Sequence, residues 1–344
     1  MAFLMSKIKV FKSIKEVCNY IKNKNLDLII CADSNVERIY ARELEELKSN
    51  NTQKWFTFPQ GENAKSLAEW ERAVEFFIER GVNRKTTLIA IGGGALSDVS
   101  GFVASTLLRG IPWIVIPTTI LSQIDASIGG KVAVNSRFGK NLIGNFHQPI
   151  EVLLCDEFLS TLEFEEVLSG YGELLKYAYI DKNVYELIEK KASMLKLMKS
   201  CAQIKLKIIT EDPQETGIRK ILNLGHTFGH VIEWKYKLSH GVSVLWGLAI
   251  IFKLFDQNDE FSKLEKMIKN LNIEDSLSNP IHKDQSIDEI FEILTKDKKL
   301  ITQKSIELVV VNEKKDVVIK EYDLANLKEL FKNKMRDISA ISFN

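Results

Sequence analysis

Residues 87–108 read TLIAIGGGALSDVSGFVASTLL, and the fold prediction depends first on the strand, turn and helix in this stretch. Residues 87–91 form a short apolar run typical of a buried strand. Three glycines at 92–94 predict a tight turn, and the small residues of 99–108 predict a closely packed helix. A unit of this kind directs backbone N–H groups at the helix N-terminus toward a nucleotide phosphate. Because Ser97 occupies the third glycine position of the GxGxxG spacing, a plain tight turn remains the alternative.

Further strand-like runs occur on both sides of this stretch, separated by segments with apolar residues at helical spacing. Short strands that alternate with helices are typical of βαβ units in a parallel sheet. We therefore expect residues 1–160 to form a Rossmann-like α/β domain that binds a nucleotide. The other predicted strands are 28–31, 55–58, 113–116 and 152–155, and the predicted helices between strands include 36–47 and 67–80.

The pattern changes after residue 160, where three- and four-residue apolar periodicity dominates. We expect residues 161–344 to form a second, mainly α-helical domain. One exception is the pair of strand-like runs at 306–311 and 317–319, which flank a charged turn and predict a hairpin. The predicted helical segments are 165–180, 184–209, 242–255 and 324–335.

The composition limits the class of protein. The chain has 344 residues, 45% of them hydrophobic and 27% charged, with a formal net charge of +1, as is typical of a two-domain globular protein. Nucleic-acid binding usually requires a basic excess, which is absent here. The longest apolar stretch, 242–252, is shorter than the roughly 20 residues of a membrane span. The N-terminus lacks a signal-peptide pattern and the four cysteines lack CxxC spacing, so we expect a cytoplasmic protein that binds neither nucleic acid nor membrane.

Basic side chains accompany glycines between residues 109 and 144. Arg109, Lys131 and Lys140 each lie directly beside a glycine. Cationic groups at glycine turns near strand ends suit an anionic small molecule that carries phosphate and carboxylate groups. A single lysine of this kind is usually a solvated surface charge, but their recurrence favours a binding site.

Asp33 follows the predicted strand 28–31. At this position its carboxylate can accept hydrogen bonds from a ribose, or it can cap the helix that begins near Ser34. The sequence leaves both interpretations open.

The histidines indicate a metal site. His226 and His230 are four residues apart and share one face of a helix, and His240 follows in Ser-His-Gly. Glu173 lies on an earlier predicted helix. One carboxylate with two neutral imidazoles leaves an open coordination position at which a bound metal can polarise a substrate oxygen. The spacing does not decide which two histidines bind, and histidines satisfied within the core are the alternative.

Together the motifs resemble those of the 3-dehydroquinate synthase family of sugar-phosphate cyclases, from Asp33 to about Lys299. The resemblance implies an N-terminal NAD-binding domain, a helical C-terminal domain that binds metal and substrate, and an active site in the cleft between them. The motifs, in the family's order, are GGGALSDVSGFVAST, RGIPWIVIPTT, DASIGGKVAVN, GKNLIGNFHQP, GELLKY, GIRKILNLGHTFGH and DKK.

The resemblance also implies roles for individual residues. The metal ligands would be Glu173, His226 and His240, with His230 facing the substrate. Asp125 and Lys140 would lie where the cofactor meets the substrate. The residues implied to hold NAD are Asp33, Asn35, Glu62, Lys65, Gly93, Gly94, Asp98, Thr118, Thr119, Asp125, Lys131, Lys140, Phe158, Thr161, Leu162 and Glu166. Those implied to bind or transform the substrate, besides His230, are Arg109, Lys131, Asn141, Lys176, Lys205, Arg219, Asn223 and Lys298.

The implied activity is that of a lyase that converts 3-deoxy-D-arabino-heptulosonate 7-phosphate into 3-dehydroquinate and phosphate, in the shikimate pathway to chorismate and the aromatic amino acids. NAD would be reduced and reoxidised within each turnover, and a divalent metal, zinc or cobalt, would assist. The family also implies a homodimer. Two other enzymes are alternatives: a cyclase acting on sedoheptulose 7-phosphate or glucose 6-phosphate, and a metal-dependent polyol or glycerol-phosphate dehydrogenase. A binding protein without activity would not require complete metal and cation sets.

The sequence departs from the family's pattern after the last implied metal ligand. The family usually reads His-Gly-Glu-Ala-Val, whereas this chain has His240 followed by Gly241, Val242, Ser243 and Val244. The segment between His230 and His240 is also a few residues shorter than usual. These changes leave the implied ligands in place and alter the residues around them.

Overall fold

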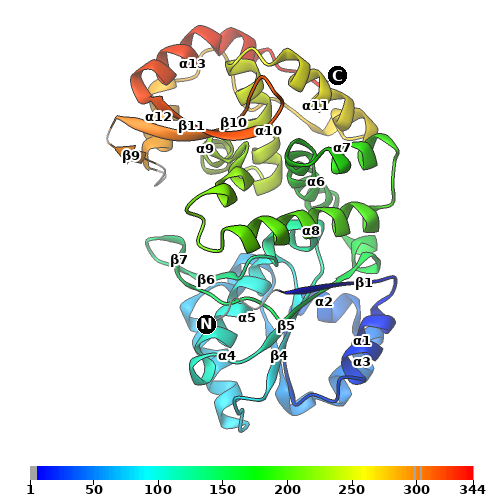
Figure 1. Cartoon of the computed structure of the whole chain (residues 1–344). Coiled ribbons are helices and arrows are strands. Elements are labelled where there is room, and N and C mark those ends of the chain that lie inside the picture. The colour runs from blue at the N-terminus through cyan, green and yellow to red at the C-terminus, as the bar shows by residue number, and fades with distance from the viewer. Residues whose placement is uncertain (1–5, 297–299, 303, 344) are drawn as a thin grey trace. The chain divides into compact units, whose positions relative to one another are not determined.

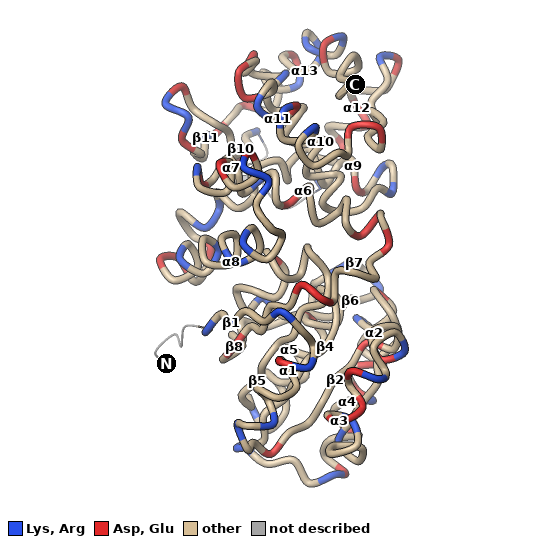
Figure 2. The backbone as a smooth tube through the Cα atoms, turned by 90° about the vertical axis from the view of Figure 1, so that its right-hand side faces the viewer, with Lys and Arg blue, Asp and Glu red and all other residues tan. Residues whose placement is uncertain are grey.

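The computed structural model describes residues 6–296, 300–302 and 304–343. It divides into two compact units, one comprising Met1–Val167 with Met194–Pro213 and the other Leu168–Ser193 with Gln214–Asn344 (Figure 1). The segment 194–213 therefore packs with the first unit, although a single boundary after residue 160 would assign it to the second. Lys and Arg alternate with Asp and Glu along both units and are not gathered in one segment (Figure 2).

The first unit is built on a six-stranded sheet in the order β1-β8-β5-β4-β2-β3, and every pairing in it is parallel. All five predicted strands are confirmed. The first strand was missed because Lys7 and Lys9 interrupt its apolar pattern. The strands are β1 Lys7–Phe11, β2 Leu28–Asp33, β3 Trp55–Phe58, β4 Thr87–Gly92, β5 Trp113–Pro117 and β8 Glu151–Cys155.

Helices cover both faces of this sheet (Figure 1). Alternate strand residues point to opposite faces, so Ile30 and Ala32 pack with α1 and α3 while Ile29 and Cys31 pack with the core beneath α4, α5 and α8. This arrangement confirms the predicted Rossmann-like α/β domain. The helices are α1 Ile14–Lys22, α2 Ser34–Ile39, α3 Ala41–Ser49, α4 Leu67–Glu79, α5 Gly94–Thr106 and α8 Met194–Glu211.

Three predicted helix boundaries are wrong. The segment 36–47 is two helices because Tyr40 (φ −107°, ψ 30°) breaks the helix, and its hydroxyl donates to the carbonyl oxygen of Phe158. The segment 184–209 is also two helices, separated near Lys191 (φ 48°), and they belong to different units. The helix expected at 99–108 begins at Gly94, since Gly93 already occupies the N-cap position.

A hairpin that the sequence analysis did not predict projects from the first unit. Its antiparallel strands are β6 Lys131–Ser136 and β7 Gly139–Phe146. Every residue of β7 is exposed, so this strand lacks the apolar pattern that marks a buried strand.

The second unit is mainly helical, as predicted, and has one three-stranded antiparallel sheet in the order β11-β10-β9. The predicted hairpin is confirmed as β10 and β11. Helix α10 is the central helix, with all its residues buried except His240 and Lys253. The elements are α6 Phe164–Ile180, which begins in the first unit, α7 Lys182–Glu189, α9 His226–Tyr236, α10 His240–Leu254, α11 Asn258–Asn270, α12 Ile287–Lys296, β9 Leu300–Thr302, β10 Ser305–Val311, β11 Val317–Asp323 and α13 Leu324–Ser339.

The four cysteines are free and buried. In the described part of the chain, no helix combines the length and the apolar character needed to cross a bilayer.

Candidate active site

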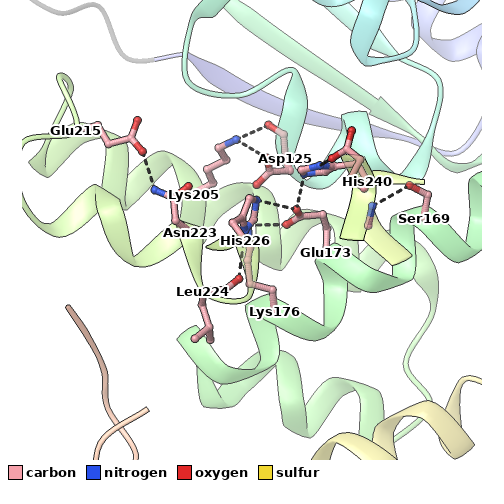
Figure 3. Close-up of polar contacts among 12 residues, drawn as sticks. Asp125, Ser169, Glu173, Lys176, Lys205, Glu215, Asn223, Leu224, His226 and His240 are labelled. Atoms are coloured by element: carbon pink, nitrogen blue, oxygen red, sulfur yellow. Dashed lines mark hydrogen bonds and ion pairs between the residues drawn. The ribbon is translucent and has the colours of Figure 1, made fainter. Parts of the chain in front are cut away.

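Three side chains of metal-ligating type converge in the second unit. Glu173 lies within α6, whereas His226 and His240 are the first residues of α9 and α10. The Nε2 atoms of His226 and His240 lie 3.3 and 3.2 Å from the same Oε1 atom of Glu173 (Figure 3). One ligand atom from each residue lies within 4.8 Å of the other two. The three side chains can therefore hold one metal ion together.

The other nitrogen of each imidazole has its own partner. Nδ1 of His226 lies 3.2 Å from the carbonyl oxygen of Leu224, and Nδ1 of His240 lies 2.9 Å from Oε2 of Glu233. A carbonyl or carboxylate at Nδ1 fixes the ring and favours the tautomer whose Nε2 lone pair can bind a metal. Both rings are therefore oriented for coordination through Nε2.

Glycines bring these helices into backbone contact. A Cβ atom on Gly172 would lie 1.8 Å from the carbonyl oxygen of Gly241, and a Cβ atom on Gly241 would lie 1.6 Å from that of Ser169. Only glycine fits at such distances, so α6 and the start of α10 can meet. Because Gly172 precedes Glu173 and Gly241 follows His240, this contact brings the two ligands together.

Burial and mutual contacts shift the pKa of each side chain in the cluster. Burial would raise the pKa of Glu173, but the Lys176 ammonium, 2.5 Å from its Oε2, and His226 hold that pKa well below its ordinary value. Burial lowers the pKa of His226 to about 4, so this imidazole is neutral. Burial would also lower the pKa of His240, but its contacts with the Glu173 and Glu233 carboxylates raise it to about 10.

The Glu173 carboxylate also has unused acceptor capacity. Within the part of the chain that the structure describes, neither of its buried oxygens has a hydrogen-bond partner at normal angles, although three nitrogens lie within 3.3 Å. The Lys176 ammonium compensates the charge at Oε2, and Oε1, which faces the two imidazoles, is the oxygen that a metal could share with them. The oxygen and two-nitrogen donor set fits a divalent metal such as zinc or cobalt.

His230 lies beside this cluster and outside it. Its ring centroid is 5.5 Å from that of His226 and 6.1 Å from that of His240. The sequence spacing left open which two histidines share the metal, and the structure groups His226 and His240 with Glu173.

Other predicted substrate residues of the second unit lie on or near a 3₁₀ helix, Ile218–Asn223. Arg219 is buried there, and Nδ2 of Asn223 donates to Oε1 of Glu215 at 2.9 Å. Lys176 is fully buried beside Glu173. Lys298 lies outside the described residues.

The first unit brings the carboxyl ends of β4 and β5 together at the glycine turn. Gly93 is the N-cap of α5, and the N–H group of Thr118 donates to the carbonyl oxygen of Gly92 at 3.0 Å. A Cβ atom on Gly93 would lie 3.2 Å from the Thr119 methyl group. The turn is therefore a backbone surface at a helix N-terminus, which suits a phosphate.

Asp33 and its neighbours end β2. The Asp33 side chain caps α2 by accepting from the N–H groups of Asn35 and Val36, so the capping interpretation is confirmed. The Asn35 side chain accepts from Arg38 at 2.7 Å. Phe158 is buried, so its ring belongs to the core, where it packs edge-on against Tyr40.

Two lysine–aspartate pairs join predicted site residues of the first unit. Nζ of Lys65 lies 2.6 Å from Asp98 and 2.5 Å from Oδ1 of Asn141, and Nζ of Lys205 donates to Asp125 at 2.8 Å. Burial raises the pKa of Asp98, while the Lys65 ammonium opposes that rise. The remaining predicted residues of this unit are exposed or half-buried: Glu62, Arg109, Lys131, Lys140, Thr161, Leu162 and Glu166.

Sequence reasoning did not assign roles to three polar residues at these sites: Glu233, Glu215 and Asn135. Glu233 had a usable signal, because it lies seven residues after His226 and so returns to the same face of α9. Glu215 and Asn135 lie in irregular or strand segments where no helical periodicity marks them.

Solved structures share this architecture. The chain is similar to a 2-deoxy-scyllo-inosose synthase complexed with carbaglucose-6-phosphate, NAD+ and Co2+, with a TM-score of 0.80 and 24% identity over 95% of this chain and 96% of that chain. It is similar to the 2-epi-5-epi-valiolone synthase ValA of Streptomyces hygroscopicus subsp. jinggangensis 5008 with NAD+ and Zn2+ bound, with a TM-score of 0.78 and 21% identity over 98% of both chains. An iron-containing alcohol dehydrogenase from Thermotoga maritima reaches a TM-score of 0.66 at 14% identity over 97% of this chain and 99% of that chain. These likenesses define the class by fold: a dehydroquinate synthase-like protein.

Sequence comparisons are more specific. Residues 55–169 match the family model of the 3-dehydroquinate synthase N-terminal domain, and residues 170–300 match that of the C-terminal domain. The 3-dehydroquinate synthase of Staphylococcus aureus (strain JH9) is 34% identical over 92% of both chains. That of Staphylococcus saprophyticus is 35% identical over 93% of this chain and 92% of its own. The chain belongs to the 3-dehydroquinate synthase family.

Proposed function

We propose that this protein is a 3-dehydroquinate synthase, which converts 3-deoxy-D-arabino-heptulosonate 7-phosphate into 3-dehydroquinate and inorganic phosphate. The observation that carries the proposal is the identity of 34% over nine-tenths of both chains to a relative of that name. The family models match residues 55–169 and 170–300, a span that includes the glycine turn and the Glu173, His226 and His240 cluster.

NAD is the proposed redox cofactor, bound along the carboxyl ends of β2, β4 and β5. The half-buried turn at Gly93 and Gly94, the ion pair of the buried Lys65 with Asp98, and the NAD+ present in two structures of the same fold support this assignment. When bound, NAD would supply reversible hydride transfer to and from the substrate, so the overall reaction would release no net NADH. Asp125 and Lys140 are the residues proposed to lie where NAD meets the substrate.

A divalent metal is the second proposed cofactor, held by Glu173, His226 and His240. When bound, it acts as a Lewis acid toward the oxygen of the hydroxyl that is oxidised. Glu233 keeps Nε2 of His240 directed toward Glu173 through the 2.9 Å contact at Nδ1. Lys176 compensates the charge of the buried Glu173 carboxylate at Oε2. His230 is proposed to contact the substrate.

Cations and amides of both units are proposed to bind the phosphate, hydroxyl and carboxylate groups. Arg219 and the Asp-Lys-Lys segment at 297–299 favour a substrate with a carboxylate over sedoheptulose 7-phosphate or glucose 6-phosphate, which have none. The proposed set is Arg109, Lys131, Asn141, Lys205, Arg219, Asn223 and Lys298.

We infer in addition that the enzyme is a cytoplasmic homodimer. Four buried, free cysteines support a reducing compartment. Light scattering of the purified protein tests the oligomeric state: twice the chain mass of 39.2 kDa is expected, and a monomer at micromolar concentration contradicts the inference.

The proposed function is tested by measuring phosphate and NADH in the same reaction. Purified protein with NAD and zinc or cobalt is mixed with 3-deoxy-D-arabino-heptulosonate 7-phosphate while phosphate and NADH are measured. We expect steady phosphate release, dependent on NAD and metal, without net NADH. Accumulation of NADH would indicate a dehydrogenase, and turnover of only sedoheptulose 7-phosphate or glucose 6-phosphate would indicate another cyclase; either result overturns the proposal.

A further inference from the structure

The β6–β7 hairpin contains an irregularity at the residues that the proposed function assigns to the substrate. Val134 pairs with Ile143 and Ser136 pairs with Gly139, so one residue of β6, Asn135, lies opposite three residues of β7. Those three residues are 140–142. A bulge of this kind bends a strand and redirects its side chains, and bulges are frequent beside active sites. Here it determines where Lys140 and Asn141 are presented.

The Asn135 side chain closes this bulge. Its Oδ1 accepts a hydrogen bond of 3.0 Å from the backbone N–H group of Asn141. Asn141 has φ 58°, in the left-handed region that non-glycine residues enter at a cost. The hydrogen bond that Asn135 accepts therefore stabilises a backbone conformation that the hairpin ladder does not hold.

The same side chain also reaches the segment before α4. Nδ2 of Asn135 donates to Oε2 of Glu62 at 2.8 Å, and its backbone N–H group donates to the carbonyl oxygen of Lys65 at 2.7 Å. A β-bridge joins Asn135 to Ser66. The donor and the acceptor of one amide thus connect a proposed NAD residue, Glu62, with a proposed substrate residue, Asn141.

Lys65 contacts the side chain of Asn141, whereas Asn135 contacts its backbone. Nζ of the buried Lys65 lies within hydrogen-bond distance of both Asn141 Oδ1 and Asp98 Oδ2, at 2.5 and 2.6 Å. Asn141 is therefore held at its backbone by Asn135 and at its side chain by Lys65. Movement of the bulge would therefore remove one of the two partners of Lys65.

We propose that Asn135 is a positioning residue of the active site, which sets the β7 bulge and so orients Asn141 toward the substrate while fixing Glu62 beside NAD. The proposal rests on the proposed function for the roles of Asn141 and Glu62. An amide is required because the position needs one acceptor, for the Asn141 N–H group, and one donor, for the Glu62 carboxylate. Aspartate keeps the acceptor and places a second negative charge against Glu62, whereas alanine removes both groups.

The test compares Asn135→Ala and Asn135→Asp with Asn145→Ala, a matched control. Asn145 is an exposed asparagine of β7 whose side chain accepts only a local hydrogen bond, from the N–H group of Phe146, among the contacts of the described hairpin. Three quantities are measured: hydrogen exchange of the Asn141 amide, the dissociation constant of NAD, and kcat and KM for 3-deoxy-D-arabino-heptulosonate 7-phosphate. Circular dichroism confirms that each variant is folded.

We expect Asn135→Ala to speed exchange at Asn141 about tenfold and to raise KM about tenfold, with kcat changed less than threefold, since each tenfold step is the loss of about one hydrogen bond. Asn135→Asp should keep the slow exchange at Asn141 and weaken NAD binding instead. Asn145→Ala should match the wild type in all three.

Two results would overturn the inference. The first is an Asn141 amide that exchanges at the same rate in Asn135→Ala as in Asn145→Ala. This result would show that Asn135 does not stabilise the bulge. The second is faster exchange in Asn135→Ala with unchanged KM and unchanged NAD affinity. This result would show that the bulge does not position the substrate or NAD residues. If the wild type does not turn over the sugar phosphate, the proposed function fails by itself, and exchange together with NAD affinity still decides the role of Asn135.

Discussion

The metal cluster of the second unit and the β6–β7 hairpin of the first unit fix functional groups in different ways. Glu173 and His240 are brought together by glycine contacts between backbones, which leave no space for even a Cβ atom. The hairpin instead holds Asn141 through two hydrogen bonds, on a strand that is exposed throughout: the Asn141 N–H group donates to Asn135, and the Asn141 side-chain oxygen accepts from Lys65. Metal ligands tolerate little displacement, so a steric device suits them, whereas a substrate-binding arm can rely on individually replaceable hydrogen bonds.

The largest effect should come from Gly241→Ala. The new Cβ atom would lie 1.6 Å from a backbone oxygen that cannot rotate away, so α6 and α10 must separate. We expect the free energy of unfolding to fall by about 3 kcal/mol or more and metal binding to be lost. Chemical denaturation and metal titration measure these effects.

Gly139→Ala is the matched control for that variant. Its Cβ atom would lie 3.2 Å from the end of the flexible Leu142 side chain, so the expected change is about 0.5 kcal/mol or less. If Gly241→Ala and Gly139→Ala destabilised the protein equally, the backbone contact at Gly241 would be no more restrictive than the hairpin position of Gly139.

The second effect concerns which histidines hold the metal. Zinc at a hundredfold excess over its dissociation constant should stabilise the wild type by about 2.7 kcal/mol. His240→Ala should abolish this stabilisation, because one of the three ligands is lost, whereas His230→Ala should keep it and slow turnover. Thermal unfolding with zinc and with chelator measures the difference. Equal loss in both variants would place His230 in the ligand set.

A smaller effect is expected from Glu233→Gln. The carboxylate that orients His240 becomes a neutral amide, so metal affinity should fall about 10- to 100-fold while the fold persists. Competition with a chromogenic chelator gives the dissociation constant. Glu186→Gln, a change at a half-exposed side chain of α7, should leave the dissociation constant unchanged. A loss of affinity in Glu233→Gln no greater than in this control would show that Glu233 does not support the metal.

The smallest effect is expected in the first unit, from Lys65→Met. Burial already raises the pKa of Asp98 against the opposing effect of Lys65, and without this lysine it rises further. The variant should therefore lose about 1–2 kcal/mol at pH 7, less than a fully buried pair because Asp98 is 22% exposed. The loss should shrink as the pH falls through the pKa of Asp98, where the carboxylate becomes neutral.

Lys22→Met, which removes an exposed ion pair with Glu46, is the control for Lys65→Met and should be nearly neutral at every pH. Chemical denaturation between pH 4 and pH 8 measures the free energy of unfolding of both variants and of the wild type. A Lys65→Met loss that is independent of pH would show that packing of the lysine stem, and not its charge, supports the hairpin.

Much of the fold followed from local pattern. Buried strands such as β4 consist of continuous apolar runs, and these were predicted to within a residue or two. The break at Tyr40 was not predictable, because it depends on hydrogen bonds to residues more than a hundred positions away. The exposed strand β7 was missed because its pairing with β6 leaves no apolar alternation.

The candidate site was likewise predictable where local pattern marks its residues, and not where distant contacts determine them. The spacing of His226 and His230 indicated a metal site but left open which two histidines belong to it, since the second imidazole of the cluster, His240, begins the next helix. The family resemblance supplied the three-residue set that the structure brings together. Asn135 carried no periodic signal, because its importance comes from a register change between two strands.

The central claim, that Glu173, His226 and His240 form the metal centre, is tested most directly by anomalous diffraction from crystals grown with zinc or cobalt. We predict one strong peak at the metal's absorption edge, within bonding distance of the Glu173 carboxylate and of Nε2 of both histidines. A peak bonded to His230 in place of His240, or no peak at this cluster in metal-saturated crystals, would contradict the account.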